Sequence, residues 1–354
     1  MSGLSTIPSI PFEEFLKARG PIIDIRSPKE FSQGHWPGSK NIPLFNNKER
    51  AIIGITYKEK GKQEAILIGI KLIIPKLTTL KTSIKEIHGK AQKAKDNSSK
   101  THLRIYCWRG GMRSKSIVWL SNHLGYNAIQ LKGGYKSYRK WVLAQFERNW
   151  RLHLIGGKTG TGKTNILSAL AKEGISTIDL EGLANHRGSS FGSIGLPTQP
   201  SCEQYENLLA ESLNQINPDL AKAIWVEDES PNLGKCRIPN GLIKQMKVAP
   251  VVEIEKNKTE RIQELIKVYA KHSKNELKEA TIRIKNRLGP QRTKIALDGI
   301  SKENWELACE AILDYYDRCY EYQLEKVVNK NKINLSKMSN ELAAKILIEN
   351  GHVF

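Results

Sequence analysis

The stretch RLHLIGGKTGTGKT, residues 151–164, determines how the second half of this 354-residue chain folds. It opens with the apolar run RLHLI, which predicts a strand, and a helix is expected from about Thr164 to Lys172. Between them lies GKTGTGKT, residues 157–164, which matches the pattern G-x-x-x-x-G-K-[ST]. The next strand is predicted at ISTIDL, residues 175–180. This succession of strand, loop, helix and strand is typical of a parallel α/β sheet.

The loop between that strand and helix has the composition of a phosphate-binding loop. Its free backbone N–H groups would surround phosphate oxygens, Lys163 would neutralise their charge, and Thr164 would offer a hydroxyl ligand to a magnesium ion. The residues predicted to bind phosphate or diphosphate are Gly157, Gly160, Gly162, Lys163 and Thr164. The motif leaves open whether the phosphate belongs to a nucleotide that is hydrolysed.

Acidic side chains end two of the predicted strands near this loop. Asp179 ends the strand after the phosphate loop, and WVEDES, residues 225–230, carries Glu227, Asp228 and Glu229. One carboxylate, with Asp179 and Asp228 as the candidates, is expected to hold magnesium through water. The sequence does not decide between them, and no stable prosthetic group is expected.

A segment rich in Gly, Ser and Pro, NHRGSSFGSIGLPTQPS at residues 185–201, is predicted to be a loop near the phosphate site. His186 and Arg187 in this loop are candidates to bind phosphate or RNA. A purely structural loop is the alternative.

Upstream, three short apolar runs predict a second parallel α/β sheet. They are PIIDI, LRIYC and NAIQL, at residues 21–25, 103–107 and 127–131. Between the last two, Ile117, Leu120 and Leu124 fall on one helical face. We therefore predict two domains, residues 1–145 and residues 146–354, the second ending in a basic helical region.

A single cysteine ends the second of those runs in an unusual setting. In IYCWRGGMRSKS, residues 105–116, Cys107 is followed by two arginines and two glycines. A thiolate is stabilised by nearby cations and by free N–H groups at a helix N-terminus, which predicts an anion cradle formed by Cys107, Arg109 and Arg113. Trp108, beside the thiol, is a candidate to stack on a base, and packing beneath the loop is the alternative.

Two chemistries fit this cradle. The spacing from Cys107 to Arg113 fits a cysteine-dependent phosphatase and equally a rhodanese-type sulfurtransferase. The upstream stretch PIIDIRSPKEFSQGHWPGSKNIPL resembles a signature at the start of rhodanese domains and favours the second. Within it Asp24, Arg26 and His35 are expected to hold the fold together. A phosphatase would also need a general acid near the thiol, and no carboxylate outside the DIR element suggests itself.

The composition points to a class of partner. Lys and Arg number 56 and Asp and Glu 36, which gives a formal net charge of +20. Such an excess is expected to attract nucleic acid first and anionic membrane second, with a lysine-rich surface kept for solubility as the alternative. The five cysteines contain no C-x-x-C pair, so neither a disulfide scaffold nor a zinc site is expected. Without a membrane-length apolar run or a signal segment, the protein is expected to be cytoplasmic.

Taken together, these motifs resemble the tRNA 2-selenouridine synthase family. The resemblance rests on their order along nearly the whole chain: CWRGGMRS, LKGGYKSYR, GKTGTGKT, DLEGLANHRGSSFGS, WVEDES and DYYDRCYEYQL. It implies a rhodanese-like domain fused to a P-loop NTPase-like α/β domain with a helical C-terminal part. It also implies an enzyme that acts on the wobble uridine of certain tRNAs.

The resemblance implies two chemical steps. In the first, the phosphate-loop domain binds geranyl diphosphate, and the sulfur of 2-thiouridine displaces pyrophosphate to give an S-geranyl intermediate. In the second, selenophosphate replaces the geranylthio group and loss of phosphate leaves 2-selenouridine, with Cys107 serving selenium transfer. A separate enzyme would supply selenophosphate where the host makes it. The segment LKGGYKSYRKW and the lysine-rich C-terminal helices are expected to contact tRNA phosphates.

Both steps act on one nucleotide, so the two loops are expected to face a common basic cleft, and no ATP hydrolysis is expected in the cycle. Two alternatives stay open. One is a sulfurtransferase or cysteine-dependent phosphatase fused to an NTPase. The other is a nucleotide-gated tRNA-binding module without covalent chemistry. The sequence leaves the tRNA species and the oligomeric state undetermined.

Overall fold

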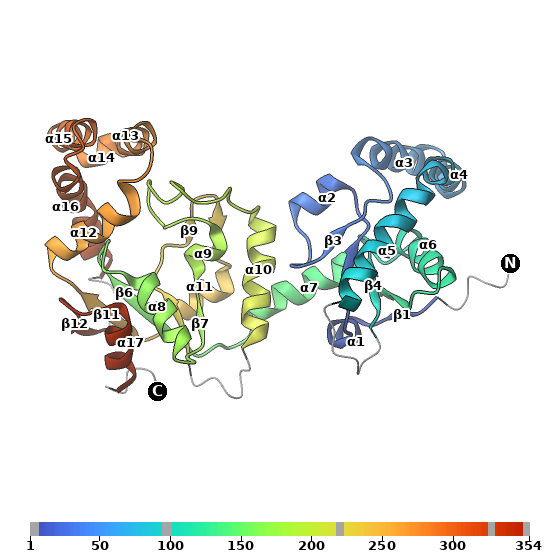
Figure 1. Cartoon of the computed structure of the whole chain (residues 1–354), viewed down its shortest axis with the longest axis horizontal. Helices are drawn as coiled ribbons and strands as arrows, with labels where there is room; N and C mark the ends of the chain where they lie inside the picture. The colour runs from blue at the N-terminus through green and yellow to red at the C-terminus, as the bar shows by residue number, and fades with distance from the viewer. Residues whose placement is uncertain (1–6, 94–100, 217–222, 325–329, 350–354) are drawn as a thin grey trace. The chain divides into compact units, whose positions relative to one another are not determined.

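A computed structural model describes residues 7–93, 101–216, 223–324 and 330–349 of the chain. The chain divides into two compact units, Met1–Ala144 and Gln145–Phe354. Each unit contains a five-stranded sheet of its own, and every strand pair in these two sheets is parallel (Figure 1). The predicted parallel α/β architecture is therefore confirmed in both halves.

The sheet of the first unit has the strand order β1-β5-β4-β2-β3. Its strands are β1 Ser9–Ile10, β2 Ile22–Asp24, β3 Lys40–Asn41, β4 Leu103–Tyr106 and β5 Ala128–Leu131. Every residue of β2 and β5 is buried, as is usual for parallel strands that are covered on both faces. The three apolar runs are confirmed as strands β2, β4 and β5, and β1 and β3 complete the sheet at its two edges.

Helices cover this sheet, and the hydrophobic core lies between the helices and the strands. They are α1 Phe12–Lys17, α2 Pro28–Gln33, α3 Asn47–Glu59, α4 Gly61–Ile73, α5 Leu77–Lys93, α6 Met112–His123 and α7 Gly134–Phe146, with a 3₁₀ turn at Ile74–Lys76. Ile23 and Ile105 from the strands share one apolar cluster with Ile84 of α5 and Val118 of α6. The helix predicted after the cysteine loop is α6, which begins at Met112.

The sheet of the second unit has the strand order β12-β11-β6-β8-β7. Its strands are β6 Leu152–Gly157, β7 Thr177–Ile178, β8 Ile224–Glu227, β11 Val251–Glu255 and β12 Lys330–Asn334, and a separate antiparallel pair is formed by β9 Asn232–Leu233 and β10 Cys236–Arg237. The phosphate loop therefore follows the central strand, and β8 with its acidic end lies next to it. Such an edge of a parallel sheet is where ligands usually bind.

The helices of the second unit are α8 Lys163–Lys172, α9 Leu180–Ala184, α10 Cys202–Gln215, α11 Asn240–Met246, α12 Lys258–Tyr269, α13 Lys274–Arg283, α14 Lys285–Leu288, α15 Pro290–Ser301, α16 Trp305–Leu324 and α17 Asn340–Glu349. Helices α12 to α16 gather into one layer (Figure 1). This layer has its own apolar cluster, which includes Leu277, Ile300 and Ala308 and also takes in Phe191 of the 185–201 loop. The C-terminal region was expected to be helical, and it also contributes β12 to the sheet edge.

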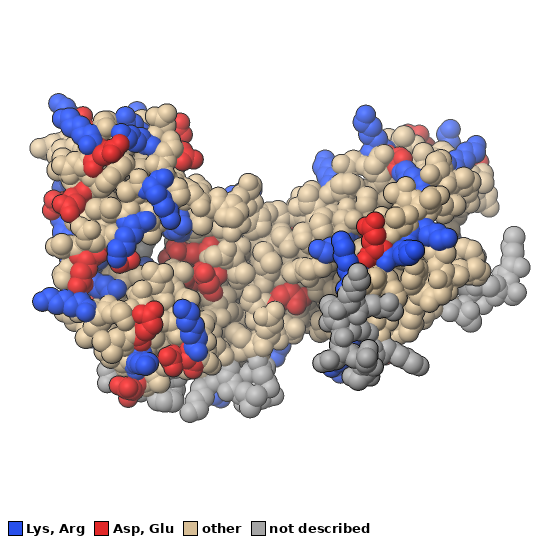
Figure 2. All heavy atoms as spheres, in the orientation of Figure 1, with Lys and Arg blue, Asp and Glu red and all other residues tan. Residues whose placement is uncertain are grey.

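Charged side chains on the face drawn in Figure 2 are not confined to one element. On the face shown in Figure 2, Lys and Arg side chains are interspersed with Asp and Glu side chains. Among the described residues, no helix combines the length and the apolar composition that a membrane span requires.

Candidate functional site

The Cys107 loop connects β4 to α6 and is held in place by the start of α7. The backbone N–H of Tyr135 donates to the Cys107 carbonyl at 2.8 Å, and that of Lys136 donates to the Trp108 carbonyl at 3.0 Å. Gly134 has a φ of +60° and approaches so closely that a Cβ atom there would lie 2.2 Å from the Cys107 carbonyl oxygen. Only glycine fits this position, so the segment LKGGYKSYR supports the loop structurally.

The thiol of Cys107 lies at the base of this loop, with only 2% of the residue exposed. Its Sγ atom is 3.1 Å from the hydroxyl oxygen of Ser114 in the first turn of α6. Gln130 of β5, which is fully buried, donates from Nε2 to this hydroxyl at 2.5 Å and to the Gly111 carbonyl at 3.1 Å. The single hydrogen of the Ser114 hydroxyl can be donated to the Gly111 carbonyl, 3.2 Å away, or to the sulfur when Cys107 is a thiolate. Sequence reasoning missed Gln130, because only the pairing of β4 with β5 brings it here.

The two arginines of the predicted cradle differ in their surroundings. Arg109 is exposed on the loop. Arg113 is half-buried, and its Nη1 atom donates to Glu30 Oε2 at 3.3 Å. Burial acts to raise the pKa of Glu30, but Arg113 and the hydrogen bond from the Ser27 N–H outweigh burial and hold that pKa below its usual value. Arg113 is thus already paired with an anion, whereas Arg109 offers its charge to solvent.

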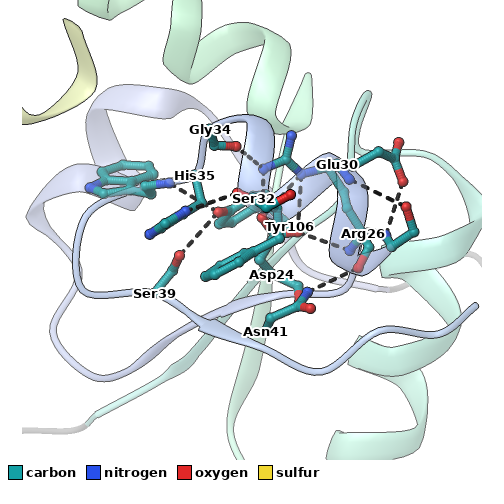
Figure 3. A network of polar contacts seen from close by, with 12 residues as sticks. Asp24, Arg26, Glu30, Ser32, Gly34, His35, Ser39, Asn41 and Tyr106 are labelled. Atoms are coloured by element: carbon teal, nitrogen blue, oxygen red, sulfur yellow. Dashed lines mark hydrogen bonds and ion pairs between the residues drawn. The ribbon is translucent and has the colours of Figure 1, made fainter. Parts of the chain in front are cut away.

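A buried ion pair lies beside the loop (Figure 3). Both oxygens of Asp24 accept from the guanidinium of Arg26, and the shortest contact is 2.7 Å. Arg26 also donates to the Gly34 carbonyl, and its guanidinium lies 3.7 Å from the centre of the Tyr135 ring. His35 Nδ1 lies 2.9 Å from the Phe31 carbonyl. Asp24 and Glu30 are both paired with arginine, so neither is available as the general acid that a cysteine-dependent phosphatase would need.

The phosphate loop has the backbone form that its glycines predict. Gly162 caps α8 with a φ of +82°, and a Cβ atom at Gly160 would lie 2.7 Å from the Arg261 carbonyl oxygen. Lys163 is the first residue of α8, and its Nζ atom donates to the Gly157 carbonyl at 2.9 Å, which folds the ammonium group back over the loop. The loop N–H groups, the helix N-terminus and Lys163 together supply the donors and the positive charge that an anion requires.

The carboxylate that faces this site most directly is Glu181. Its Oε2 atom lies 3.4 Å from Thr164 Oγ1, whereas Asp179 is exposed and accepts from the Gly182 N–H at 2.6 Å as the cap of α9. Burial and the neighbouring Glu229 raise the pKa of Glu181 to about 9. Sequence reasoning singled out Asp179 because it ends the strand. Glu181 lies in the first turn of α9, and no spacing signal indicated it.

The carboxylates at the end of β8 also lie close to the loop. Glu227 is fully buried and accepts from the Leu180 N–H at 3.1 Å, and burial together with Asp179 raises its pKa to about 8. The backbone N–H of Asp228 donates to the Ile155 carbonyl at 3.0 Å, and burial raises the pKa of its side chain.

The oxygen atoms near Thr164 suit a magnesium ion, which prefers oxygen ligands and usually takes only one or two carboxylates besides substrate phosphates. The Thr164 hydroxyl and Glu181 are close enough to share one ion, and Asp228 lies on the adjacent strand end. Within the described part of the chain, no group of three or more His, Cys, Asp or Glu side chains is arranged to hold a metal by itself. An ion here would therefore need the phosphate oxygens of a ligand.

The segment 185–201 is a loop, as predicted, and it is tightly packed. His186 is buried, a Cβ atom at Gly192 would lie 2.7 Å from its ring, and burial lowers its pKa. The Arg187 guanidinium donates to the Ile194 carbonyl at 2.9 Å and lies 5.8 Å from the centre of the Tyr269 ring. Both candidate side chains thus have structural contacts within this loop and its neighbours.

An apolar pocket, partly open to solvent and with a cavity volume of about 70 Å³, adjoins the phosphate loop. Thr159 of the phosphate loop and Ser189 of the 185–201 loop form part of its wall. Most of the rest comes from helices α12, α13, α15 and α16, including Leu265, Leu277, Ile300 and Cys309. Burial raises the pKa of the Cys309 thiol to about 11, so this group is a neutral wall at physiological pH. A ligand with phosphates on the loop and an apolar tail would fill both spaces.

Comparisons with known proteins match this arrangement. The family model described as the tRNA 2-selenouridine synthase AAA domain matches residues 150–350, and the rhodanese-like domain model matches residues 12–140. A protein of Sulfurovum sp. (strain NBC37-1) named tRNA 2-selenouridine synthase is 33% identical, over 95% of this chain and 97% of its own. Proteins of the same name from Hydrogenovibrio crunogenus and Marinobacter nauticus are 32% and 33% identical, over 89% and 86% of this chain and 92% and 88% of theirs. The segment that matches the rhodanese-like model contains the Cys107 loop, and the segment that matches the AAA-domain model contains the phosphate loop.

Proposed function

Because this chain belongs to the tRNA 2-selenouridine synthase family, we propose that it converts 2-thiouridine at the wobble position of tRNA into 2-selenouridine. The chain is an enzyme of that family. The formal charge of +20 suits a polyanionic substrate, and binding is expected to weaken as salt rises.

The first half-reaction is S-geranylation with geranyl diphosphate. The observation that carries this proposal is the apolar pocket at the edge of the phosphate loop, since Thr159 belongs to both. The diphosphate would bind the loop N–H groups and Lys163, and the geranyl chain would lie along the apolar helices. When the tRNA sulfur attacks the geranyl carbon, pyrophosphate leaves, and the charge on its oxygens is stabilised where the cations already are.

The residues near Thr164 would hold a magnesium ion in this half-reaction. Bound magnesium would supply charge neutralisation for the leaving pyrophosphate. The Thr164 hydroxyl and Glu181 would be the protein ligands of the ion, together with Asp228, which follows the adjacent strand β8. Since Glu181 has a raised pKa, a cation at this position would also favour its ionised form.

The second half-reaction belongs to the Cys107 loop. Selenophosphate is an anion, and the loop provides an exposed Arg109, the N-terminus of α6 and a thiol that accepts a hydrogen bond from Ser114 when ionised. Selenium would displace the geranylthio group from the base, and hydrolysis of the Se–P bond would then release phosphate. A separate enzyme would supply the selenophosphate.

The test is mass spectrometry of nucleosides from 2-thiouridine-containing tRNA. The tRNA is incubated with protein, magnesium and geranyl diphosphate, and then with selenophosphate. We expect a geranyl adduct first and 2-selenouridine second. Lys163→Ala should abolish the adduct, with exposed Lys172→Ala as the matched control, and Cys107→Ser should block only the second conversion, with exposed Cys202→Ser as its control. Unchanged tRNA with the wild-type protein at both stages would contradict the proposal.

A further inference from the structure

An indole ring lies exposed at the rim of the Cys107 loop. Trp108 directly follows the thiol residue and is 37% exposed, and Met112 on the other side of the loop is 53% exposed. Both rim residues are apolar, although they lie beside a cysteine whose predicted ligand is an anion. Part of the Trp108 ring packs against neighbouring residues, and part of the residue is open to solvent.

Contacts of the Trp108 ring and backbone fix the position of this residue. Its ring centre lies 5.7 Å from that of Tyr135, and the buried Arg26 guanidinium lies 5.8 Å from it. The carbonyl of Trp108 accepts the hydrogen bond from the Lys136 N–H described above. Because the residue is held by its backbone and on one side of its ring, a planar partner could add to the exposed surface with little loss of conformational entropy.

Basic side chains lie on the segment that supports this loop. Lys132, Lys136 and Lys140 recur at intervals of four residues at the start and along one side of α7, and all three are exposed. In the described part of the chain none of them forms an ion pair with a carboxylate. Exposed lysines without acidic partners favour binding to the phosphate backbone of a nucleic acid over binding to a protein surface that carries charges of both signs.

We propose that Trp108 is the stacking platform for the base that is modified, and that Lys136 and Lys140 bind the phosphates beside it. This inference rests on the proposed function, since it takes a single-stranded tRNA loop as the ligand. An unpaired uracil ring that stacks on an indole is held in one plane, and an exposed aromatic ring accepts any base face. Stacking on Trp108 would place the base beside the residue that bears the thiol.

The experiment separates the base from the backbone. Dissociation constants of the full-length protein are measured for an anticodon stem-loop with 2-thiouridine at the wobble position and for the same RNA with an abasic site there. Because stacking of one base contributes about 1–3 kcal/mol, the wild-type protein should bind the abasic RNA roughly 5- to 150-fold more weakly. Trp108→Phe should keep most of this ratio, and Trp108→Leu should reduce it to about one.

The lysines are tested with the same RNAs over a series of salt concentrations. The double variant Lys136→Gln, Lys140→Gln should weaken binding of both RNAs equally and lower the salt slope by about 0.7 per lysine. The matched control is Lys81→Gln, Lys85→Gln, an exposed pair on α5 with the same spacing, which should leave the slope unchanged.

The possible outcomes discriminate between this inference and the proposed function. If Trp108→Leu keeps the wild-type ratio while its melting temperature and the alkylation rate of Cys107 are unchanged, the platform is refuted and the proposed function stands. If the wild-type protein modifies tRNA but shows no difference between the two RNAs, the platform is refuted as well. If the wild-type protein binds neither RNA, the proposed function fails, and the platform fails with it.

Discussion

The apolar pocket beside the phosphate loop should make the protein sensitive to the length of an isoprenoid chain. We consider Cys309, a small pocket residue on α16. The variant Cys309→Phe adds a ring to the pocket wall, and Cys309→Ala removes the sulfur without filling space. Since burial raises the pKa of the Cys309 thiol to about 11, neither variant removes a reactive thiolate.

The expected size of the effect follows from the area that the chain buries. Geranyl is longer than dimethylallyl by one isoprene unit of about five carbon atoms, and a buried CH₂ contributes roughly 0.8 kcal/mol, so full burial of the unit would contribute about 4 kcal/mol. The pocket is partly open to solvent, so we take about half of this. A contribution of about 2 kcal/mol corresponds to a roughly 30-fold lower KM for geranyl diphosphate than for dimethylallyl diphosphate.

The assay measures prenylation of 2-thiouridine tRNA with each diphosphate. In Cys309→Ala we expect the wild-type preference, whereas in Cys309→Phe the KM for geranyl diphosphate should rise about 30-fold and that for dimethylallyl diphosphate about threefold at most. Melting temperatures of the two variants control for overpacking. Equal KM values for the two diphosphates in the wild-type protein, or full geranyl activity in folded Cys309→Phe, would refute the assignment of the pocket.

Three further predictions concern the groups around the two loops. Ser114→Ala removes the hydrogen bond to the sulfur, and because a bond to a charged group contributes about 1.5–3 kcal/mol, alkylation of Cys107 at neutral pH should slow about tenfold or more, as read from the labelled peptide. Asp24→Asn leaves the buried Arg26 unpaired, so the free energy of unfolding in denaturant titration should fall by about 3–5 kcal/mol. Burial raises the pKa of Glu227 from 4.5 to about 8, so the folded protein keeps a proton that the unfolded chain releases. The free energy of unfolding should therefore fall as pH rises between these values, by at most ~1.4 kcal/mol per pH unit, and Glu227→Gln should flatten that dependence.

Each of these variants has a matched control at an exposed position. Ser116→Ala, two residues after Ser114 on α6, should leave the alkylation rate of Cys107 unchanged. As the control for Asp24→Asn, Lys29→Gln should shift the free energy of unfolding by less than about 0.5 kcal/mol. As the control for Glu227→Gln, Glu279→Gln should leave the pH dependence of the free energy of unfolding unchanged. Each argument is contradicted when the test variant behaves like its control.

Local patterns in the sequence predicted much of the fold. Apolar runs identify β2, β4 and β5 because buried parallel strands are apolar on both faces. The strand β12 escaped prediction, since its sequence KNKIN alternates lysine and asparagine with a single isoleucine and reads as polar. Strands of two residues, such as β1, are too short to show any period.

The site follows the same division between local and long-range signals. Cys107 and Lys163 lie in motifs that a reader of the sequence can find, because one loop holds all the groups that the motif needs. Glu181 and Gln130 reach the two loops only through chain folding, one from the turn after a neighbouring strand and one from an adjacent strand. The apolar pocket combines residues from Thr159 to Tyr316, and no sequence window contains enough of them to reveal it.

The burial of the Cys107 thiol affects how readily this residue is oxidised. When a thiol ionises, the resulting thiolate is the form that peroxide attacks. Exposed thiolates are then oxidised further to sulfinic and sulfonic acids, which are not readily reduced. Only 2% of the residue is exposed, so the sulfur has little contact with solvent. Burial of the sulfur hinders its approach to a bulky disulfide, so the exposed Cys202 and Cys319 are expected to form mixed disulfides before Cys107 does.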